Sequence, residues 1–182
     1  YMLIFREKTE MYIKKEWKSL LFVFLASFLP RVLLCLNNLP LNSLPDELST
    51  IAAAAQYAGK DWSEIVSTTR YYGTGFTSLF TPLFVLSDNP FFIYRCMMII
   101  CAMVQSFSAP IAYVIMNKYF DIKDRKYTIV SSIACSYMVV TYVTYVYNEH
   151  PMILCSWMIA LLLILLVKYV DDKKKKNIFV II

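Results

Sequence analysis

Two adjacent carboxylates, Asp46 and Glu47, lie in the stretch "NSLPDELSTIAAAAQYAG", directly after an apolar run from residue 19 to 36. A carboxylate placed there can accept the proton of a hydroxyl, which is otherwise a poor nucleophile. Glu47 can tune Asp46, because a nearby like charge raises a carboxylate pKa. It can equally point away, since adjacent helical residues do not share a face. A plainer interpretation is that both are first-turn acids that favour the helix dipole.

Further charged residues stand at the edges of apolar runs. Arg95 lies near the start of the run 91–117, where its planar fork suits bidentate contact with a phosphate, or anchors the helix at the interface. Arg70 is a second candidate cation. Glu149 lies in the short sequence "NEH". It is interpreted either as a ligand of a divalent metal ion or as an acid at the end of a loop. Arg31, inside the first run, requires a partner that the sequence does not identify.

The composition assigns these residues to a membrane protein. Of 182 residues, 59% are hydrophobic and 17% are charged, and the mean hydropathy is +0.54. A soluble domain carries about 25% charged residues. The uncharged runs are about twenty residues long, which is enough to cross the bilayer as helices. The net charge is +5, and the placement of the basic residues indicates membrane orientation rather than nucleic-acid binding. The five cysteines lie in apolar runs without the spacing of a disulfide framework or a metal site.

The fold class expected is an all-α, polytopic transmembrane helix bundle. The predicted spans are residues 19–36, 91–117, 127–147 and 151–167, with another beginning at 178. Residues 1–182 are therefore expected to form a single transmembrane domain and to be the N-terminal part of a longer protein. The stretch 73–87 is short and contains Pro82, so we expect a half-embedded helix there rather than a span.

Basic residues predict the orientation. The segments 1–18, 118–126 and 168–176 carry fourteen of the eighteen lysines and arginines, which indicates that they are cytoplasmic. The N-terminus is then cytoplasmic, and residues 37–90 form a long outer loop. We expect the protein in a bacterial plasma membrane, with its active site on the outer face.

The outer loop is predicted to contain helices that lie parallel to the membrane. Ser43 or Asp46 can cap a helix that continues through Ala58 and stops at Gly59. A second short helix is expected from Asp61, which with Glu64 has capping-box spacing. The apolar faces of both helices would rest on the membrane surface, with Trp62 in the headgroup layer.

Three motifs in this layout resemble the C-type (GT-C) glycosyltransferases, in particular the dolichyl-phosphate-mannose protein mannosyltransferase and aminoarabinose transferase group. "PDELSTIAAAAQYAG" looks like the first outer loop of that group. "PLFVLSDNPFFIYRCMMII" is similar to its hydrophobic segment before an arginine, here Arg95. "YNEHP" supplies an acid, Glu149, in the next outer loop. The resemblance covers about residues 15 to 170.

The resemblance implies an inverting transfer of a sugar from a polyprenyl-phosphate donor to a lipid, glycan or protein acceptor of the cell envelope. It implies Asp46 as general base with Glu47 beside it, and Arg95 and Arg70 as phosphate-binding cations. A divalent metal, Mg²⁺ or Mn²⁺, held by Asp46 and Glu149, is left open. The alternatives are a transporter or flippase subunit, which requires ionisable residues within the spans, and a non-catalytic membrane protein.

Overall fold

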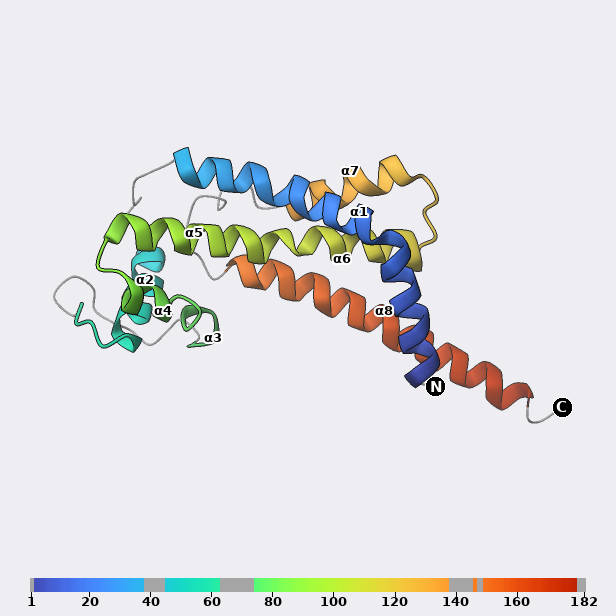
Figure 1. Cartoon of the computed structure of the whole chain (residues 1–182). Coiled ribbons are helices and arrows are strands. Elements are labelled where there is room, and N and C mark those ends of the chain that lie inside the picture. Colours follow the sequence, from blue (N-terminus) through green and yellow to red (C-terminus); the bar gives the residue numbers. More distant parts are fainter. Residues whose placement is uncertain (1, 38–44, 63–73, 138–145, 147–148, 180–182) are drawn as a thin grey trace.

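The computed structural model describes residues 2–37, 45–62, 74–137, 146 and 149–179, and each regular element within these ranges is a helix (Figure 1). The elements are α1 (Met2–Asn37), α2 (Pro45–Tyr57), α3 (Thr74–Thr77), α4 (Thr81–Leu86), α5 (Pro90–Ser106), α6 (Ser108–Val114), η1 (Ile115–Tyr119), α7 (Arg125–Ser136) and α8 (Glu149–Phe179).

Long helices form an elongated bundle. α1 and α5 pack along each other in opposite directions, α8 packs against α5 and α6, and α7 packs against α6 and α1 (Figure 1). Three stretches are long and apolar enough to cross a membrane: Glu10–Asn37, Pro90–Tyr119 and Glu149–Asp171. The predicted spans 19–36, 91–117 and 151–167 lie within them. The expectation of an all-helical fold is therefore confirmed over the described residues, with three stretches that are long and apolar enough to span a membrane.

Side-chain placement explains why these helices suit a bilayer. On α5, Ile93, Met97 and Cys101 recur every four residues and are buried against the neighbouring helices. On α8, by contrast, Leu162 and Leu166 are exposed although they are apolar. In water such a surface would be unfavourable, whereas lipid covers it without cost.

Two predicted boundaries differ from the structure. α7 covers only Arg125–Ser136 of the predicted span 127–147, and residues 138–145 lie outside the described ranges. A helix of 12 residues is too short to cross a bilayer alone. The predicted loop 168–176 and the separate helix at 178 were wrong, because α8 continues unbroken to Phe179. Lysine is a good helix former, so the basic segment need not end the helix.

The helices α2, α3 and α4 form a separate group at one end of the bundle. The predicted stop of α2 is confirmed: Gly59 has φ +78°, and the Lys60 amide donates to the Ala55 carbonyl at 2.9 Å. This is the Schellman arrangement, which satisfies the last carbonyls of a helix. Residues 74–87 contain the short helices α3 and α4, each too short to cross a bilayer alone, and the half-embedded position of this stretch stays a prediction.

The buried face of α2 packs on protein. Ile51, Ala54 and Ala55 belong to the main core with Phe84 of α4 and Met97 of α5. The predicted second helix from Asp61 lies mostly outside the described residues. Trp62 packs edge-on against Phe84 with ring centroids 5.9 Å apart, and its place in the headgroup layer stays a prediction.

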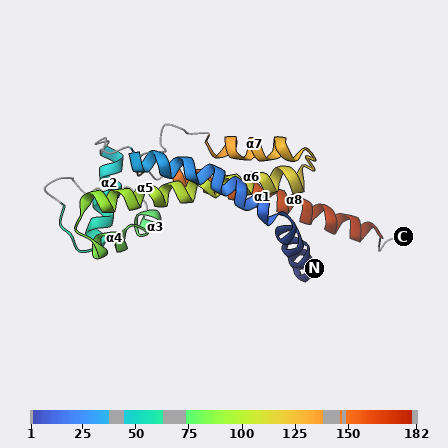
Figure 2. The same ribbon diagram turned by 45° about the horizontal axis from the view of Figure 1, so that its top comes forward.

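The start of α1 and the end of α8 lie at the end of the bundle opposite α2, α3 and α4, and the turn between η1 and α7 lies there too (Figures 1 and 2). The three basic segments therefore share one end of the molecule. This arrangement agrees with the predicted alternation of the helices, while the side of the membrane on which each end lies stays a prediction.

The central span is interrupted at Phe107, between α5 and α6. Pro110 has no amide hydrogen, so the carbonyl of Ser106 loses its regular helical donor. The polar side chains of Ser106 and Ser108 bond locally to the carbonyls of Ala102 and Gln105. Polar side chains therefore lie at the interruption of an otherwise apolar helix.

Candidate functional site

Glu47 is the central residue of the candidate site. It lies in the first turn of α2 and is fully buried. Its Oε1 accepts a hydrogen bond from the Tyr94 hydroxyl of α5 at 2.6 Å and another from the Val146 amide at 2.8 Å. One carboxylate oxygen thus joins three segments that are far apart in the sequence.

The other carboxylate oxygen of Glu47, Oε2, is available to accept a proton. Oε2 is buried and has no hydrogen-bond partner among the described residues. Burial raises the pKa of the Glu47 carboxyl above its usual range, and the hydrogen bonds from Tyr94 and Val146 lower it in part. A buried carboxylate with a raised pKa and an unused oxygen is a stronger proton acceptor than an exposed one.

Asp46, the predicted base, begins α2 beside Glu47, after Pro45. Only its backbone is described, so its predicted role as base or metal ligand stays a prediction. The pair does open a helix, as expected. Glu47 points into the bundle because it lies on the same side of α2 as Ile51 and Ala54, which are buried.

A cavity of about 160 Å³ adjoins this carboxylate through Tyr94. It lies between α2, α4 and α5. Its walls are mainly apolar. The lining residues are Leu48, Ile51, Lys60, Trp62, Phe84, Ser87, Asp88, Pro90, Ile93, Tyr94 and Met97.

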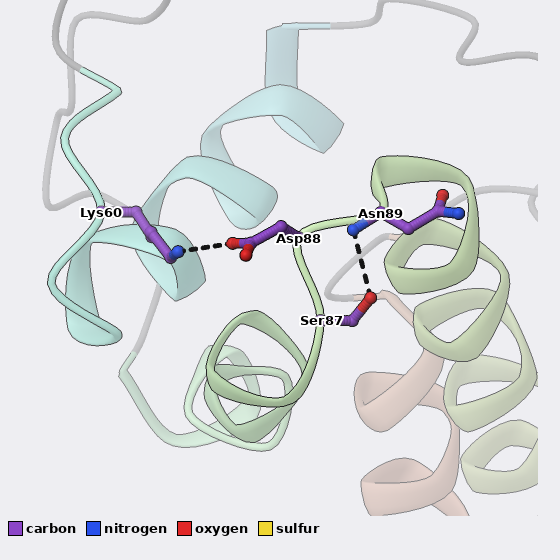
Figure 3. A network of polar contacts seen from close by, with 4 residues as sticks. All are labelled: Lys60, Ser87, Asp88 and Asn89. Carbon is purple, nitrogen blue, oxygen red and sulfur yellow. Dashed lines mark hydrogen bonds and ion pairs between the residues drawn. The ribbon is translucent and has the colours of Figure 1, made fainter.

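An ion pair stands among those lining residues. Lys60 Nζ lies 2.7 Å from the Asp88 carboxylate, linking the segment after α2 to the segment before α5 (Figure 3). The hydrogen bond and charge of Lys60 lower the pKa of Asp88. Beside the pair, the Asn89 amide donates to Ser87 Oγ at 3.1 Å (Figure 3). Both ionic side chains are largely exposed, so the pair contributes little stability.

Asn89 starts α5 and so places Tyr94. Its side-chain oxygen accepts from the amides of Phe91 and Phe92 at 3.0 and 3.2 Å, and Pro90 occupies the first helical position. This is a normal N-cap with proline at the position that tolerates it. The cap fixes the register of α5, which directs Tyr94 inward to Glu47.

The structure does not place all of the other predicted site residues next to the Glu47 carboxylate. Arg95 is exposed on α5 and is not among the residues that line the cavity. Its neighbour Tyr94 points to Glu47, so Arg95 points elsewhere. Arg70 lies outside the described residues. Glu149 is half-buried at the start of α8, three positions after Val146, and its Oε2 is buried without a partner in the described part of the chain.

The predicted metal site can be compared with this arrangement. Glu47 and Glu149 each offer one buried carboxylate oxygen without a described partner, and carboxylate oxygens are the ligands that Mg²⁺ and Mn²⁺ prefer. Over the described ranges, however, no three His, Cys, Asp or Glu side chains cluster. The structure therefore supplies parts of a ligand set, and metal binding stays a prediction.

A second polar centre surrounds Arg31, which is fully buried in α1. Its guanidinium donates to the Ser27 carbonyl at 2.6 Å, to the Ser106 hydroxyl at 3.2 Å and to the Ser136 carbonyl at 2.5 Å. Its Cζ lies 3.8 Å from the centroid of the Tyr137 ring. The partner that the sequence could not identify is a set of hydroxyl and carbonyl oxygens from α1, α5 and α7.

Gln105 extends this polar centre to α8. Its amide nitrogen donates to the Ser136 carbonyl at 3.1 Å, and its oxygen lies 2.8 Å from Nδ1 of His150. This orientation of the amide makes Nδ1 of His150 the donor. His150 is buried in the first turn of α8.

Sequence reasoning missed Tyr94, Val146 and Ser136. Val146 acts through its backbone amide, which no side-chain pattern marks. Tyr94 carried a signal, because it is a polar residue one position before Arg95 in an apolar run. The serines in separate spans carried another signal, since small polar residues are common where membrane helices touch.

The comparisons with other proteins add no relative. No family model, no curated protein and no solved structure matches the chain.

Proposed function

We propose that this chain is a membrane glycosyltransferase that uses a polyprenyl-phosphate-linked sugar as donor and works at the end of the bundle where α2 lies. The observation that supports this most directly is the buried carboxylate of Glu47, which is held through Oε1 while Oε2 has no described partner. An acceptor hydroxyl requires such a base, because its own proton must leave as the glycosidic bond forms.

In this proposal Glu47 accepts the proton, and Tyr94 and Val146 orient it. Asp46 precedes it in the same turn and remains the alternative base. The apolar cavity next to Tyr94 supports a substrate with hydrocarbon character, and Lys60 supplies a positive charge beside it. Arg95 lies near the same end of α5 and is exposed, which is compatible with contact to a phosphate at the interface.

The test is sugar transfer in reconstituted membranes with polyprenyl-phosphate sugar supplied. Glu47→Gln is expected to lower the turnover at least about 100-fold, because general-base catalysis contributes on the order of 10²- to 10⁴-fold. Asp46→Asn is measured in parallel, and Asp171→Asn on the exposed surface of α8 serves as the carboxylate-to-amide control. Full activity of Glu47→Gln would remove Glu47 from the mechanism.

A transporter or flippase subunit is the second candidate, and one observation favours it. The buried group of Arg31, Gln105 and His150 lies inside the bundle, beside an interrupted helix, which is where transporters hold polar substrates. Reconstituted vesicles with a fluorescent polyprenyl-phosphate analogue distinguish the two functions. Transbilayer movement without sugar transfer would favour the flippase.

A further inference from the structure

A cluster of lysines and tyrosines lies between α1, η1 and α8, at the end of the bundle opposite α2. Lys118 Nζ lies 5.1 Å from the centroid of the Tyr12 ring and 5.5 Å from that of the Tyr119 ring. Lys168 Nζ, from α8, lies 4.8 Å from the same Tyr119 ring. These distances are typical of cation–π contacts. Two ammonium groups from different helices therefore lie beside one tyrosine.

The positions of these residues along their helices place the cluster at the polar boundary of the membrane. Tyr12, Lys118 and Lys168 each lie within three residues of one end of a different stretch that is long and apolar enough to cross a bilayer. Tyr127 and Tyr169, at the same end of the bundle, are exposed. Tyrosine is enriched at the level of the lipid headgroups. The two ammonium groups therefore lie at the depth of the lipid phosphates.

The π-helical turn η1 sets the direction of Lys118 and Tyr119. The Phe120 amide donates to the Ile115 carbonyl at 3.0 Å, which is the hydrogen bond of a π-helix. Such a turn holds more residues than a regular α-helical turn, and it is frequent at functional sites. The Tyr12 hydroxyl joins α1 to this turn, because it donates to Asn117 Oδ1 at 2.8 Å. The cluster is thus held by contacts between helices.

Two carboxylates at this end of the bundle have other described partners. Glu16 accepts at Oε2 from the Tyr113 hydroxyl at 3.0 Å and from the Ser19 hydroxyl at 3.1 Å. Asp121 lies 3.8 Å from Lys123 in the turn before α7. The like charges of the cluster repel each other, and an anion between them would offset that repulsion. The arrangement therefore suits an anion from outside the chain.

An apolar face of α8 continues from Lys168 toward the centre of the bilayer. Leu161, Ile164 and Leu165 lie seven, four and three positions before Lys168, so they share its face of the helix. All three are half-buried, so part of each side chain is open to the surroundings. The hydrocarbon chains of a lipid can cover this face while its headgroup lies at the lysine.

We propose that Lys118, Lys168 and Tyr119 bind the headgroup phosphate of an anionic phospholipid, whose acyl chains lie along α8. The two ammonium groups supply the charge, and the Tyr119 hydroxyl donates to a phosphate oxygen. Lys168 is exposed and Lys118 is half-buried, so lipid of the surrounding membrane has access to both. The site lies at the opposite end of the bundle from Glu47 and does not depend on the proposed function (Figure 1).

The experiment measures lipid binding to the whole chain in detergent by native mass spectrometry, with phosphatidylglycerol and phosphatidylcholine of identical acyl chains. The wild type is expected to bind phosphatidylglycerol more tightly. Lys118→Gln and Lys168→Gln are each expected to weaken that binding about 5-fold, and the double variant about 25-fold, because one basic residue beside anionic lipid contributes about that factor. Binding of phosphatidylcholine is expected to stay unchanged.

The charge-matched control is the double variant of Lys123→Gln and Lys126→Gln. Both lysines are exposed at the same end of the bundle and lie outside the cluster. The control is expected to keep the wild-type affinity for phosphatidylglycerol. The lysines at positions 173–176 remain in every variant, so their general attraction for anionic lipid is constant.

Three results would overturn the proposal. They are equal affinity of the wild type for the two lipids, an equal loss of affinity in the control, and displacement of phosphatidylglycerol by inorganic phosphate at equal concentration. The last result would identify a site for a free anion. If the Lys118→Gln and Lys168→Gln double variant does not fold, the single variants and Tyr119→Phe decide, and wild-type affinity in all three would have the same meaning.

Discussion

Glu47 is a carboxyl group enclosed by protein, and its environment favours the protonated form. For an acid, a folded-state pKa above the unfolded value means that the native state binds more protons than the unfolded state between those two values. The contribution of Glu47 to the free energy of unfolding is therefore highest at low pH. It decreases as the pH rises from the ordinary pKa of 4.5 to the raised pKa of the folded state. Retaining such a residue costs stability, which is typical of functional sites.

The substitution Glu47→Gln tests whether the pKa of Glu47 is raised in the folded protein. The amide has nearly the same shape and no charge, so the variant is expected to be more stable than the wild type at pH 7. The difference should shrink as the pH falls toward 4.5. Thermal unfolding in detergent at several pH values measures it. A constant difference across the pH range would contradict a raised pKa.

Tyr94→Phe removes the 2.6 Å hydrogen bond to Glu47 and leaves the Val146 amide in place. We expect a loss of about 1.5–3 kcal/mol in the free energy of unfolding, the usual range for a hydrogen bond to a charged group. The pKa of Glu47 should rise further, because that bond favours the carboxylate. Tyr127→Phe, an exposed tyrosine on α7, is the matched control and should change neither quantity.

At the scale of elements, the end of α2 sets the geometry beside the cavity. Gly59 adopts a left-handed conformation and turns the chain so that Lys60 faces Asp88. An L-residue with a side chain is strained at this φ, although a Cβ at Gly59 would meet no atom within 4 Å. Backbone conformation alone, without crowding, therefore requires glycine there.

Gly59→Ala is expected to destabilise the protein by about 1 kcal/mol for that reason. Gly75→Ala is the control: its Cβ would also meet nothing within 4 Å, but its φ is not in the left-handed region. Within α3 the alanine should be neutral or slightly stabilising. Chemical denaturation of both variants gives the comparison, and equal effects would contradict the backbone argument.

The sequence predicted those elements whose signals are local. Gly59 was recognised as a helix stop because its role needs only its own residue type. Of the four spans predicted from the lengths of the apolar runs, three lie within helices long and apolar enough to cross a membrane. The partners of Arg31 could not be predicted, because Ser106 and Ser136 lie 75 and 105 positions away and serine is common in membrane helices. The role of Val146 could not be predicted either, because a backbone amide leaves no trace in the side-chain pattern.

At the scale of the whole molecule, the bundle has two chemically different ends. One carries α2, α3, α4 and the acidic residues Glu47 and Asp88, and the other carries the start of α1, the end of α8 and the turn before α7 (Figure 1). Basic residues concentrate at the second end, which predicts that it faces the cytoplasm.

Cysteine labelling tests that orientation. Asp88→Cys and Asp121→Cys place thiols at exposed positions of opposite ends. A membrane-impermeant maleimide added to intact cells is expected to label only the first, and to label the second after the membrane is opened. Among the native cysteines only Cys155 is exposed, and it lies within the apolar part of α8, where a charged reagent does not reach. Labelling of Asp121→Cys in intact cells would reverse the orientation.

The burial of Arg31 has a consequence for biosynthesis. α1 precedes α5 and α7 in the chain, so the guanidinium of Arg31 enters the insertion machinery before Ser106 and Ser136 have been translated. An arginine at the centre of a nascent span costs on the order of 3 kcal/mol on insertion scales, and Arg31, six residues from the end of its span, costs less; the leucines and phenylalanines of α1 must offset that cost. Membrane integration of α1 is thus the step of biosynthesis that Arg31 opposes. It is there that substitutions of distant apolar residues in α1 would reduce the yield without altering the finished molecule.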